Sequence, residues 1–421
     1  MAPAPNEANA DGPGRAGAGA GAGAARPAAA GGNAALWLPD DDLAPDDAAF
    51  TRRIRAFAEE HLQPHARAID EQRTFRREMV RDLAAAGILG GPLPAAVGGG
   101  DWTPLQLALA HEELGAVCGN ARGFCAVQTG LVAQCLLRFG DDAQRRRWLG
   151  PLVRGEAIGC FALTEPDAGS DVASLQTRAL RRASGFALAG TKHWITNGGV
   201  ADVAIVFATV DPALGHKGIT AFLVETDRPG LSRTPMDGVE LGHRGSDHAV
   251  LTFDGLEAPA DAVVGGEGNG FKVAMGGLAA GRLSVAAGAV GIHRAALAAA
   301  VAFTAGRRQF GQPLASFQMV QERLADMLTS LHQTRALVHR CARRRAAGTE
   351  THADVAMAKL AATEAAAAAA EQSVLLHGAR GYSSAHAPER LLRDIQALRI
   401  YEGTSMIQKT ILARLLTQPS R

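Results

Sequence analysis

A glutamate near the C-terminal end of the chain is the residue best suited to acid–base chemistry. Glu402 lies in the segment Tyr401-Glu-Gly-Thr-Ser405, and Ser405-x-x-Gln408 has the form of a capping box that opens a final helix. Helix electrostatics alone would favour a carboxylate there. In an apolar pocket, however, desolvation would raise the pKa of this carboxyl and make it a general base. These residues alone leave both interpretations open.

A polar loop in the middle of the chain is a second candidate. The segment Thr164-Glu-Pro-Asp-Ala-Gly-Ser-Asp171 combines proline, glycine and small polar residues, which is typical of a tight loop with exposed backbone N–H groups. Such groups can bind a carbonyl oxygen or the polar edge of a ligand. A plain surface turn is the simpler interpretation.

The elements that must hold these residues follow from the apolar spacing. It is helical from Asp47 to about Gly155, has a period of two between Gly159 and about Pro259, and is helical again from Phe271 onwards. We therefore expect an α+β protein with an N-terminal helical domain (37–155), a middle β domain (156–270) and a C-terminal helical bundle (271–421). Residues 1–36 are mostly Ala, Gly and Pro, which predicts a disordered tail.

Composition excludes several classes of protein. The net charge of +1 gives no basic stripe, so nucleic acid is not an expected partner. Five scattered cysteines show neither a C-x-x-C pair nor metal-ligand spacing, which indicates reduced thiols, a cytoplasmic location and no metal site. The most apolar stretch, Leu283 to Phe303, is interrupted by His293 and Arg294, so no membrane span is expected. No G-x-G-x-x-G follows a strand, which argues against a Rossmann fold.

Four motifs, in this order, resemble those of the acyl-CoA dehydrogenase family across about residues 45 to 415. They are Phe161-Ala-Leu-Thr-Glu-Pro-Asp-Ala-Gly-Ser-Asp171, Lys192-His-Trp-Ile-Thr-Asn197, Arg307-Arg-Gln-Phe-Gly311 with Phe317-Gln318, and Arg393-Asp394 followed by Tyr401-Glu-Gly-Thr-Ser405. The resemblance implies an N-terminal helical domain, a middle β-barrel or sandwich and a C-terminal helical bundle. It also implies non-covalently bound FAD and an electron-transfer flavoprotein as electron acceptor.

The resemblance gives Glu402 the role of the catalytic base. It would remove the α-proton of an acyl-CoA thioester while the β-hydrogen leaves as a hydride to the flavin. Some branches of the family place the base just before the position of Arg282; here Gly281 stands there and cannot act. The residues that the resemblance implies for substrate binding are Ser170, Arg282, Tyr401 and Gly403.

The cofactor contacts have a physical rationale as well. Trp194 and Thr196 would share one face of a strand because side chains alternate, so the indole could cover the flavin and the hydroxyl could bind it; packing in a β core is the alternative.

The guanidinium of Arg307 suits a pyrophosphate, although a solvated helix charge is the more common role. By resemblance, Arg307 and Gln309 reach the dinucleotide of a neighbouring subunit, which implies a homotetramer or a dimer. The expected FAD contacts are Phe161, Ala162, Leu163, Thr164, Gly169, Ser170, Trp194, Ile195, Thr196, Arg307, Gln309, Phe310, Phe317, Gln318, Leu375, Gly378, Ala379, Thr404 and Met406.

The chain departs from the family pattern at one place, and three rival functions stay open. The family usually carries Gln-x-x-Gly-Gly where this chain has Leu375-Leu-His-Gly-Ala379, so binding of the adenosine side could be rearranged. The same chemistry could act on an acyl group carried by an acyl carrier protein. The motifs are also compatible with an oxidase that returns electrons to oxygen, and with a non-catalytic flavin- or acyl-binding paralogue.

Overall fold

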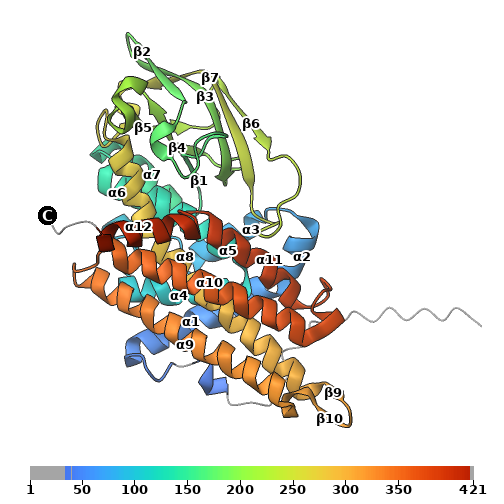
Figure 1. The fold of residues 1–421 in the computed structure, drawn as a ribbon. Helices are drawn as coiled ribbons and strands as arrows, with labels where there is room; N and C mark the ends of the chain where they lie inside the picture. Colours follow the sequence, from blue (N-terminus) through green and yellow to red (C-terminus); the bar gives the residue numbers. More distant parts are fainter. Residues whose placement is uncertain (1–33, 39, 418–421) are drawn as a thin grey trace, which may run out of the picture.

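A computed structural model describes residues 34–38 and 40–417 of the chain. A β domain lies at one end of the molecule and long helices form the other end, with the N-terminal helices beside both (Figure 1). The first helical part comprises α1 (Pro45–Phe57), α2 (Gln63–Gln72), α3 (Arg77–Ala85), α4 (Pro104–Val117), α5 (Gly119–Cys125), α6 (Gln134–Phe139) and α7 (Asp142–Val153). A π-helical segment, η4 (Ala126–Ala133), joins α5 to α6.

The end of the predicted tail contacts the helical bundle. Residues 1–33 of the predicted disordered tail lie outside the described residues. The last three, Ala34–Leu36, form a 3-10 turn, and the Leu36 carbonyl lies 2.7 Å from Nε2 of His332. The predicted tail therefore includes three residues that have a defined place against the bundle.

The middle domain is one mixed sheet of eight strands. Its strands are β1 (Gly159–Ala162), β2 (Arg178–Arg182), β3 (Gly185–Thr196), β4 (Val203–Thr209), β5 (Ile219–Glu225), β6 (Leu231–Pro235), β7 (His248–Pro259) and β8 (Val263–Val264). They follow the order β6-β7-β3-β2-β4-β5-β8, and β1 pairs with β4 in parallel. Strands are found in the region where the sequence predicts them. Burial alternates along the first half of β7, whereas all seven residues of β4 are buried.

The C-terminal part is built from long helices. They are α8 (Gly270–Gly306), α9 (Gln318–Ala346), α10 (His352–His377), α11 (Ala387–Ile400) and α12 (Ser405–Thr417), and a small hairpin of β9 (Arg308–Gln309) and β10 (Gln312–Pro313) follows α8. By length and composition alone, α8 could cross a membrane. Two thirds of its most apolar window, 67%, is buried inside the protein, which is the usual state of a core helix.

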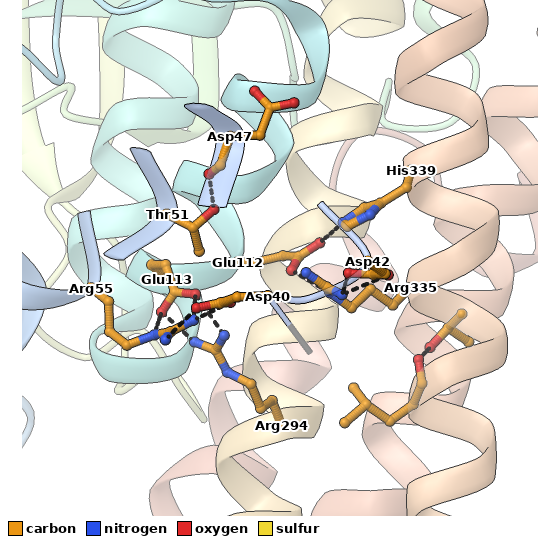
Figure 2. A network of polar contacts seen from close by, with 12 residues as sticks. Asp40, Asp42, Asp47, Thr51, Arg55, Glu112, Glu113, Arg294, Arg335 and His339 are labelled. Carbon is orange, nitrogen blue, oxygen red and sulfur yellow. Dashed lines mark hydrogen bonds and ion pairs between the residues drawn. The ribbon is translucent and has the colours of Figure 1, made fainter. Parts of the chain in front are cut away.

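A network of ion pairs ties the N-terminal segment to the bundle (Figure 2). Glu113 of α4 accepts hydrogen bonds from Arg55 and Arg294, whose nitrogens lie 3.1 Å and 2.5 Å from it. Its neighbour Glu112 accepts from Arg335 at 3.1 Å and lies 2.7 Å from Nε2 of His339. Buried carboxylates need such partners, and these hold α4 against α8 and α9.

Candidate active site

Glu402 lies in the turn between α11 and α12. It adopts a left-handed conformation with φ of 54°, and Gly403 follows at 91°, so two consecutive residues with positive φ separate the two helices. Helix α12 begins at Ser405, and the hydroxyl of Thr404 accepts a hydrogen bond from the backbone N–H of Ile407 at 3.3 Å. The capping box predicted at Ser405 was therefore wrong, because Thr404 is the N-cap and Ser405 donates to Glu364 instead.

Three side chains from different helices hold this turn. Arg282 of α8 donates from Nε to the Glu402 carbonyl at 3.1 Å, and Lys359 of α10 donates to the Gly403 carbonyl at 2.6 Å. Gln408 of α12 donates to the same Gly403 carbonyl at 2.9 Å. Because the backbone of the turn is fixed from three sides, the direction of the Glu402 side chain is fixed as well.

The carboxylate of Glu402 sits in a desolvated position. Burial raises the pKa of Glu402 to about 7, while the positive charges of Arg122, Lys359 and Arg282 oppose that rise. Its Oε2 atom is covered and makes no hydrogen bond to any described residue, although the residue as a whole keeps partial exposure. A carboxylate with a pKa near neutrality and a free lone pair has the properties of a general base.

Gly281 is the neighbour that leaves room for this carboxylate. A Cβ atom on Gly281 would lie only 2.3 Å from Oε2 of Glu402. The sequence indicates that Gly281 cannot be a base, and the structure adds that a side chain there would displace the carboxylate.

The Glu402 carboxylate opens into a pocket between the β domain and the helices, called here the Glu402 pocket. It brings together eight of the predicted site residues, namely Phe161, Leu163, Thr164, Trp194, Ile195, Thr196, Tyr401 and Glu402. Helix residues near the π-helical segment and side chains of the β6–β7 connection complete it, among them Arg122, Ala126, Leu131, His243, Ser246, His248 and Leu278. Local π-helical geometry is often found at functional sites.

Trp194 reaches this pocket in a different way from the predicted one. The register of β3 against β7 shifts between Lys192 and Ile195, and Trp194 adopts a positive φ of 59° within this bulge. The regular alternation of side chains between the two faces of the strand is therefore interrupted at Trp194. Both Trp194 and Thr196 nevertheless line the pocket. The indole is 55% exposed, so its ring is available to a ligand.

A buried ion pair connects the polar loop to this strand. Lys192 of β3 is fully buried and donates to Oε1 of Glu165 at 2.6 Å and to the Leu163 carbonyl at 3.1 Å. Glu165 also accepts hydrogen bonds from the backbone N–H groups of Gln176 and Thr177. The two predicted motifs thus fold onto one another, which brings Thr164 beside β3.

Several predicted residues lie outside the pocket. Ala162 is buried within β1, and Gly169, Ser170 and Met406 are exposed, Met406 at the start of α12. Arg307, Gln309, Phe310, Phe317 and Gln318 surround the β9–β10 hairpin, at the end of the bundle opposite the β domain (Figure 1). Leu375, Gly378 and Ala379 lie where α10 ends, and the adjacent Arg380 lines a surface pocket together with Arg307. Within one chain, these residues do not meet Glu402.

Sequence reasoning missed two buried cations at the site, Arg122 and Lys359. Arg122 donates to the Tyr401 hydroxyl, and its guanidinium carbon lies 5.5 Å from the centroid of the Tyr401 ring. Lys359 is one of only five lysines in an arginine-rich chain, and it lies in the apolar stretch of α10. A lysine within the otherwise apolar residues 355–362 is the signal that could have indicated a buried role.

Comparison with known proteins adds independent findings. Models of the N-terminal, middle and C-terminal domains of acyl-CoA dehydrogenases match residues 44–156, 160–256 and 268–417. The mitochondrial short-chain specific acyl-CoA dehydrogenase of Homo sapiens is 39% identical over 367 residues, which cover 87% of this chain and 89% of that protein.

Solved structures resemble the chain over nearly its whole length. Butyryl-CoA dehydrogenase from Megasphaera elsdenii superposes with a TM-score of 0.86 at 36% identity, covering 90% of this chain and 99% of that one. A glutaryl-CoA dehydrogenase from Mycobacterium smegmatis, in complex with FADH2, gives a TM-score of 0.87 at 32% identity and covers 92% and 98% of the two chains.

Proposed function

Because the chain belongs to the acyl-CoA dehydrogenase family, we propose that it binds FAD and oxidises an acyl-CoA thioester between its α and β carbons. The observation that carries this proposal is the Glu402 carboxylate, which is desolvated, held from three helices and open to a pocket between two domains. Proton abstraction next to a thioester requires a base with these properties.

The residues of the Glu402 pocket fit a flavin ring. Trp194 offers an exposed indole, Thr164 and Thr196 offer hydroxyl groups, and Phe161 and Leu163 supply an apolar wall. We propose that these residues hold the ring of FAD beside Glu402. Bound FAD supplies the acceptor for the hydride that leaves the β carbon.

The chain itself performs the proton transfer. Ionised Glu402 accepts the α-proton of the substrate on its carboxylate, and Oε2 has no competing hydrogen bond within the described residues. Arg282, Lys359 and Gln408 keep the turn fixed, so the base does not move away when it becomes neutral. Positioning of this kind lowers the entropic cost of reaching the transition state.

The proposal is tested with the purified protein and butyryl-CoA under anaerobic conditions. We expect FAD in the supernatant of the denatured protein and bleaching of the flavin absorbance when the substrate is added. Glu402→Gln should retain FAD but reduce the flavin about 10²–10⁴ times more slowly, because an amide cannot accept the proton.

A matched control is Glu257→Gln, which makes the same change at an exposed carboxylate of β7 and should behave as the wild type. Bleaching of Glu402→Gln within a factor of a few of the wild-type rate would place the base elsewhere. FMN in place of FAD would contradict the cofactor assignment.

We also propose that the protein is a homo-oligomer and that an electron-transfer flavoprotein accepts its electrons. The oligomer is supported by the Arg307 region, which lies too far along the bundle from Glu402 to meet it within one chain. Five buried, free cysteines support a cytoplasmic location. Stopped-flow reoxidation with air and with an electron-transfer flavoprotein distinguishes a dehydrogenase from an oxidase.

A further inference from the structure

The segment of α8 beside the Glu402 carboxylate is rich in glycine. Gly276, Gly277 and Gly281 all lie in this part of the helix. A Cβ atom would lie 2.9 Å from Sγ of Cys135 at Gly277 and 2.3 Å from Oε2 of Glu402 at Gly281, so the packing leaves no room for side chains. Glycine destabilises the interior of a helix. This part of α8 therefore needs support from outside the helix.

Arg345 supplies such support from the last turn of α9. Its Nη2 and Nη1 atoms donate to the carbonyls of Ala279 and Ala280, at 2.8 Å and 3.1 Å. Its Nε atom lies 3.0 Å and 3.1 Å from the two carboxylate oxygens of Glu350, which orients the guanidinium. A carbonyl oxygen has two lone pairs, so it can accept from Arg345 as well as from the N–H group of its own helix. Arg345 thus holds two consecutive carbonyls of α8.

These carbonyls directly precede the two α8 residues that contact the Glu402 turn. Gly281 leaves the space that the carboxylate occupies, and Arg282 donates from Nε to the Glu402 carbonyl at 3.1 Å. Residues 279–282 span about one turn of helix. The turn of α8 that Arg345 holds is therefore the turn against which Glu402 rests. Figure 1 shows α8 running from the β domain into the helical bundle, where α9 lies.

Arg345 itself stands back from the site. It is not among the described residues that line the Glu402 pocket, and its side chain is 19% exposed. A bound substrate would not touch it. Any effect of Arg345 on the reaction must pass through the α8 turn or through its charge.

The charge of Arg345 acts on Glu402 in a definite direction. Burial raises the pKa of Glu402 to about 7, and Arg345 is one of the positive charges that oppose this rise. The other charged and titratable groups around Glu402 are Arg122 of α5, Arg282 of α8, Lys359 of α10, Tyr401 of the same turn, and His243 and His248 of the β6–β7 connection. These groups stay in place when Arg345 is replaced, so a changed pH dependence reports on Arg345.

We infer that Arg345 is a positioning residue for the proposed reaction, because it holds the α8 turn against which the Glu402 carboxylate rests and favours the ionised form of that carboxylate. This inference rests on the proposed function, since Glu402 is the base of that reaction. Replacing Arg345 should change the rate of proton abstraction and leave substrate binding nearly unaltered.

Arg345→Met removes the charge and both carbonyl contacts while keeping an unbranched side chain. Anaerobic stopped-flow experiments with the FAD-loaded protein and butyryl-CoA, across about pH 5 to 9, give the limiting rate of flavin reduction and the dissociation constant of the substrate. We expect a limiting rate roughly ten- to a hundredfold lower, because a displacement of about 1 Å can have this effect. The rise of the rate should move to higher pH, because the lost positive charge disfavours ionised Glu402. The dissociation constant should stay within a factor of a few of the wild-type value.

Two further variants make the test specific. Arg345→Lys keeps the charge and an N–H donor, so it should restore the pH dependence and most of the rate. Arg344→Met makes the same change one residue earlier, in a side chain that contacts Asp354 at 3.0 Å and the Thr349 carbonyl at 2.7 Å and should behave as the wild type. If Arg345→Met does not fold, as judged by FAD retention, Arg345→Gln carries the same test.

The outcomes separate this inference from the proposed function. An unchanged limiting rate and pH dependence in Arg345→Met, even at a lower melting temperature, would mean a purely structural role and overturn the inference alone. Equal losses in Arg344→Met would also overturn it, because they would show a general effect of this end of α9. No bleaching of the wild type by butyryl-CoA or by other acyl-CoA thioesters would overturn the proposed function, and the inference with it.

Discussion

Gly281 and Glu402 compete for one small volume in the active site. The carboxylate of Glu402 occupies the place that a side chain at position 281 would take, with Oε2 at 2.3 Å and Oε1 at 2.7 Å from a Cβ there. Both atoms belong to a side chain in a turn that is fixed by Arg282, which binds the Glu402 carbonyl, and by Lys359, which binds the Gly403 carbonyl. The position of this carboxylate, which we propose to be the catalytic base, therefore depends on the absence of a side chain at residue 281.

Replacing Gly281 by alanine tests this relation. Alanine stabilises an α-helix by about 1 kcal/mol relative to glycine, so the fold of α8 should persist. The carboxylate must move, and a displacement of about 1 Å can lower a rate about a hundredfold. We expect Gly281→Ala to reduce flavin about a hundredfold more slowly at an unchanged melting temperature. Gly130→Ala is the control, because a Cβ there meets nothing within 4 Å; equal rates for both variants would contradict the steric argument.

The protonation of Glu402 predicts a pH dependence. Burial raises its pKa to about 7, and only the ionised form can accept a proton. The rate of flavin reduction should therefore rise about tenfold per pH unit below 7 and become constant above it. Lys359→Met removes a neighbouring positive charge, which disfavours the ionised form and should move this rise to higher pH. A shift to lower pH, measured by stopped-flow absorbance across about pH 5 to 9, would contradict the assigned role of Lys359.

At the scale of the elements, the Glu165–Lys192 pair joins the polar loop to β3. Lys192 is fully buried, and Glu165 is 6% exposed. Burial lowers the pKa of Lys192 to about 8, while Glu165 favours its charged form. The pair therefore matters mainly because each charge would be costly without its partner.

We expect Lys192→Met to destabilise the protein by about 3–5 kcal/mol, because it leaves Glu165 as an unpaired buried charge. The double variant Lys192→Met with Glu165→Gln should recover much of this loss. Urea unfolding of the three proteins, each free of added ligand, measures the free energies. A double variant less stable than the single one would show that Glu165 serves the backbone N–H groups of Gln176 and Thr177 more than Lys192.

The elements also show what the sequence could and could not predict. Apolar composition predicts buried strands such as β4 and β5, and the motif around Glu402 predicts its turn. The sequence does not predict the bulge at Trp194, because a register shift depends on the partner strand β7. The cap at Thr404 rather than Ser405 depends on Glu364, which lies 41 residues earlier and binds the Ser405 hydroxyl. Arg122 and Tyr401 lie 279 residues apart in the chain, and only the packing of the helices brings them to one pocket.

At the scale of the whole molecule, the predicted cofactor contacts fall into two groups. Residues of the Glu402 pocket lie between the β domain and the helices, while the Arg307 region lies at the opposite end of the bundle (Figure 1). The exposed ring of Phe310, 94% accessible, lies 6.2 Å from that of Phe317. A large exposed apolar side chain beside arginines is typical of a surface that contacts a partner or a ligand.

If this surface binds the dinucleotide of a neighbouring subunit, Arg307→Ala should weaken FAD retention and the oligomer together. A charge-assisted contact to a pyrophosphate contributes on the order of 1.5–3 kcal/mol, or roughly ten- to a hundredfold in affinity for the cofactor. Arg343→Ala, which removes an exposed arginine near the C-terminal end of α9, is the matched control and should change neither property. Size-exclusion chromatography with detection at the flavin wavelength measures both quantities during dilution. Loss of flavin without a change in oligomeric state would mean that Arg307 binds FAD within its own subunit. Unchanged values of both would leave Arg307 as a solvated charge at the end of α8.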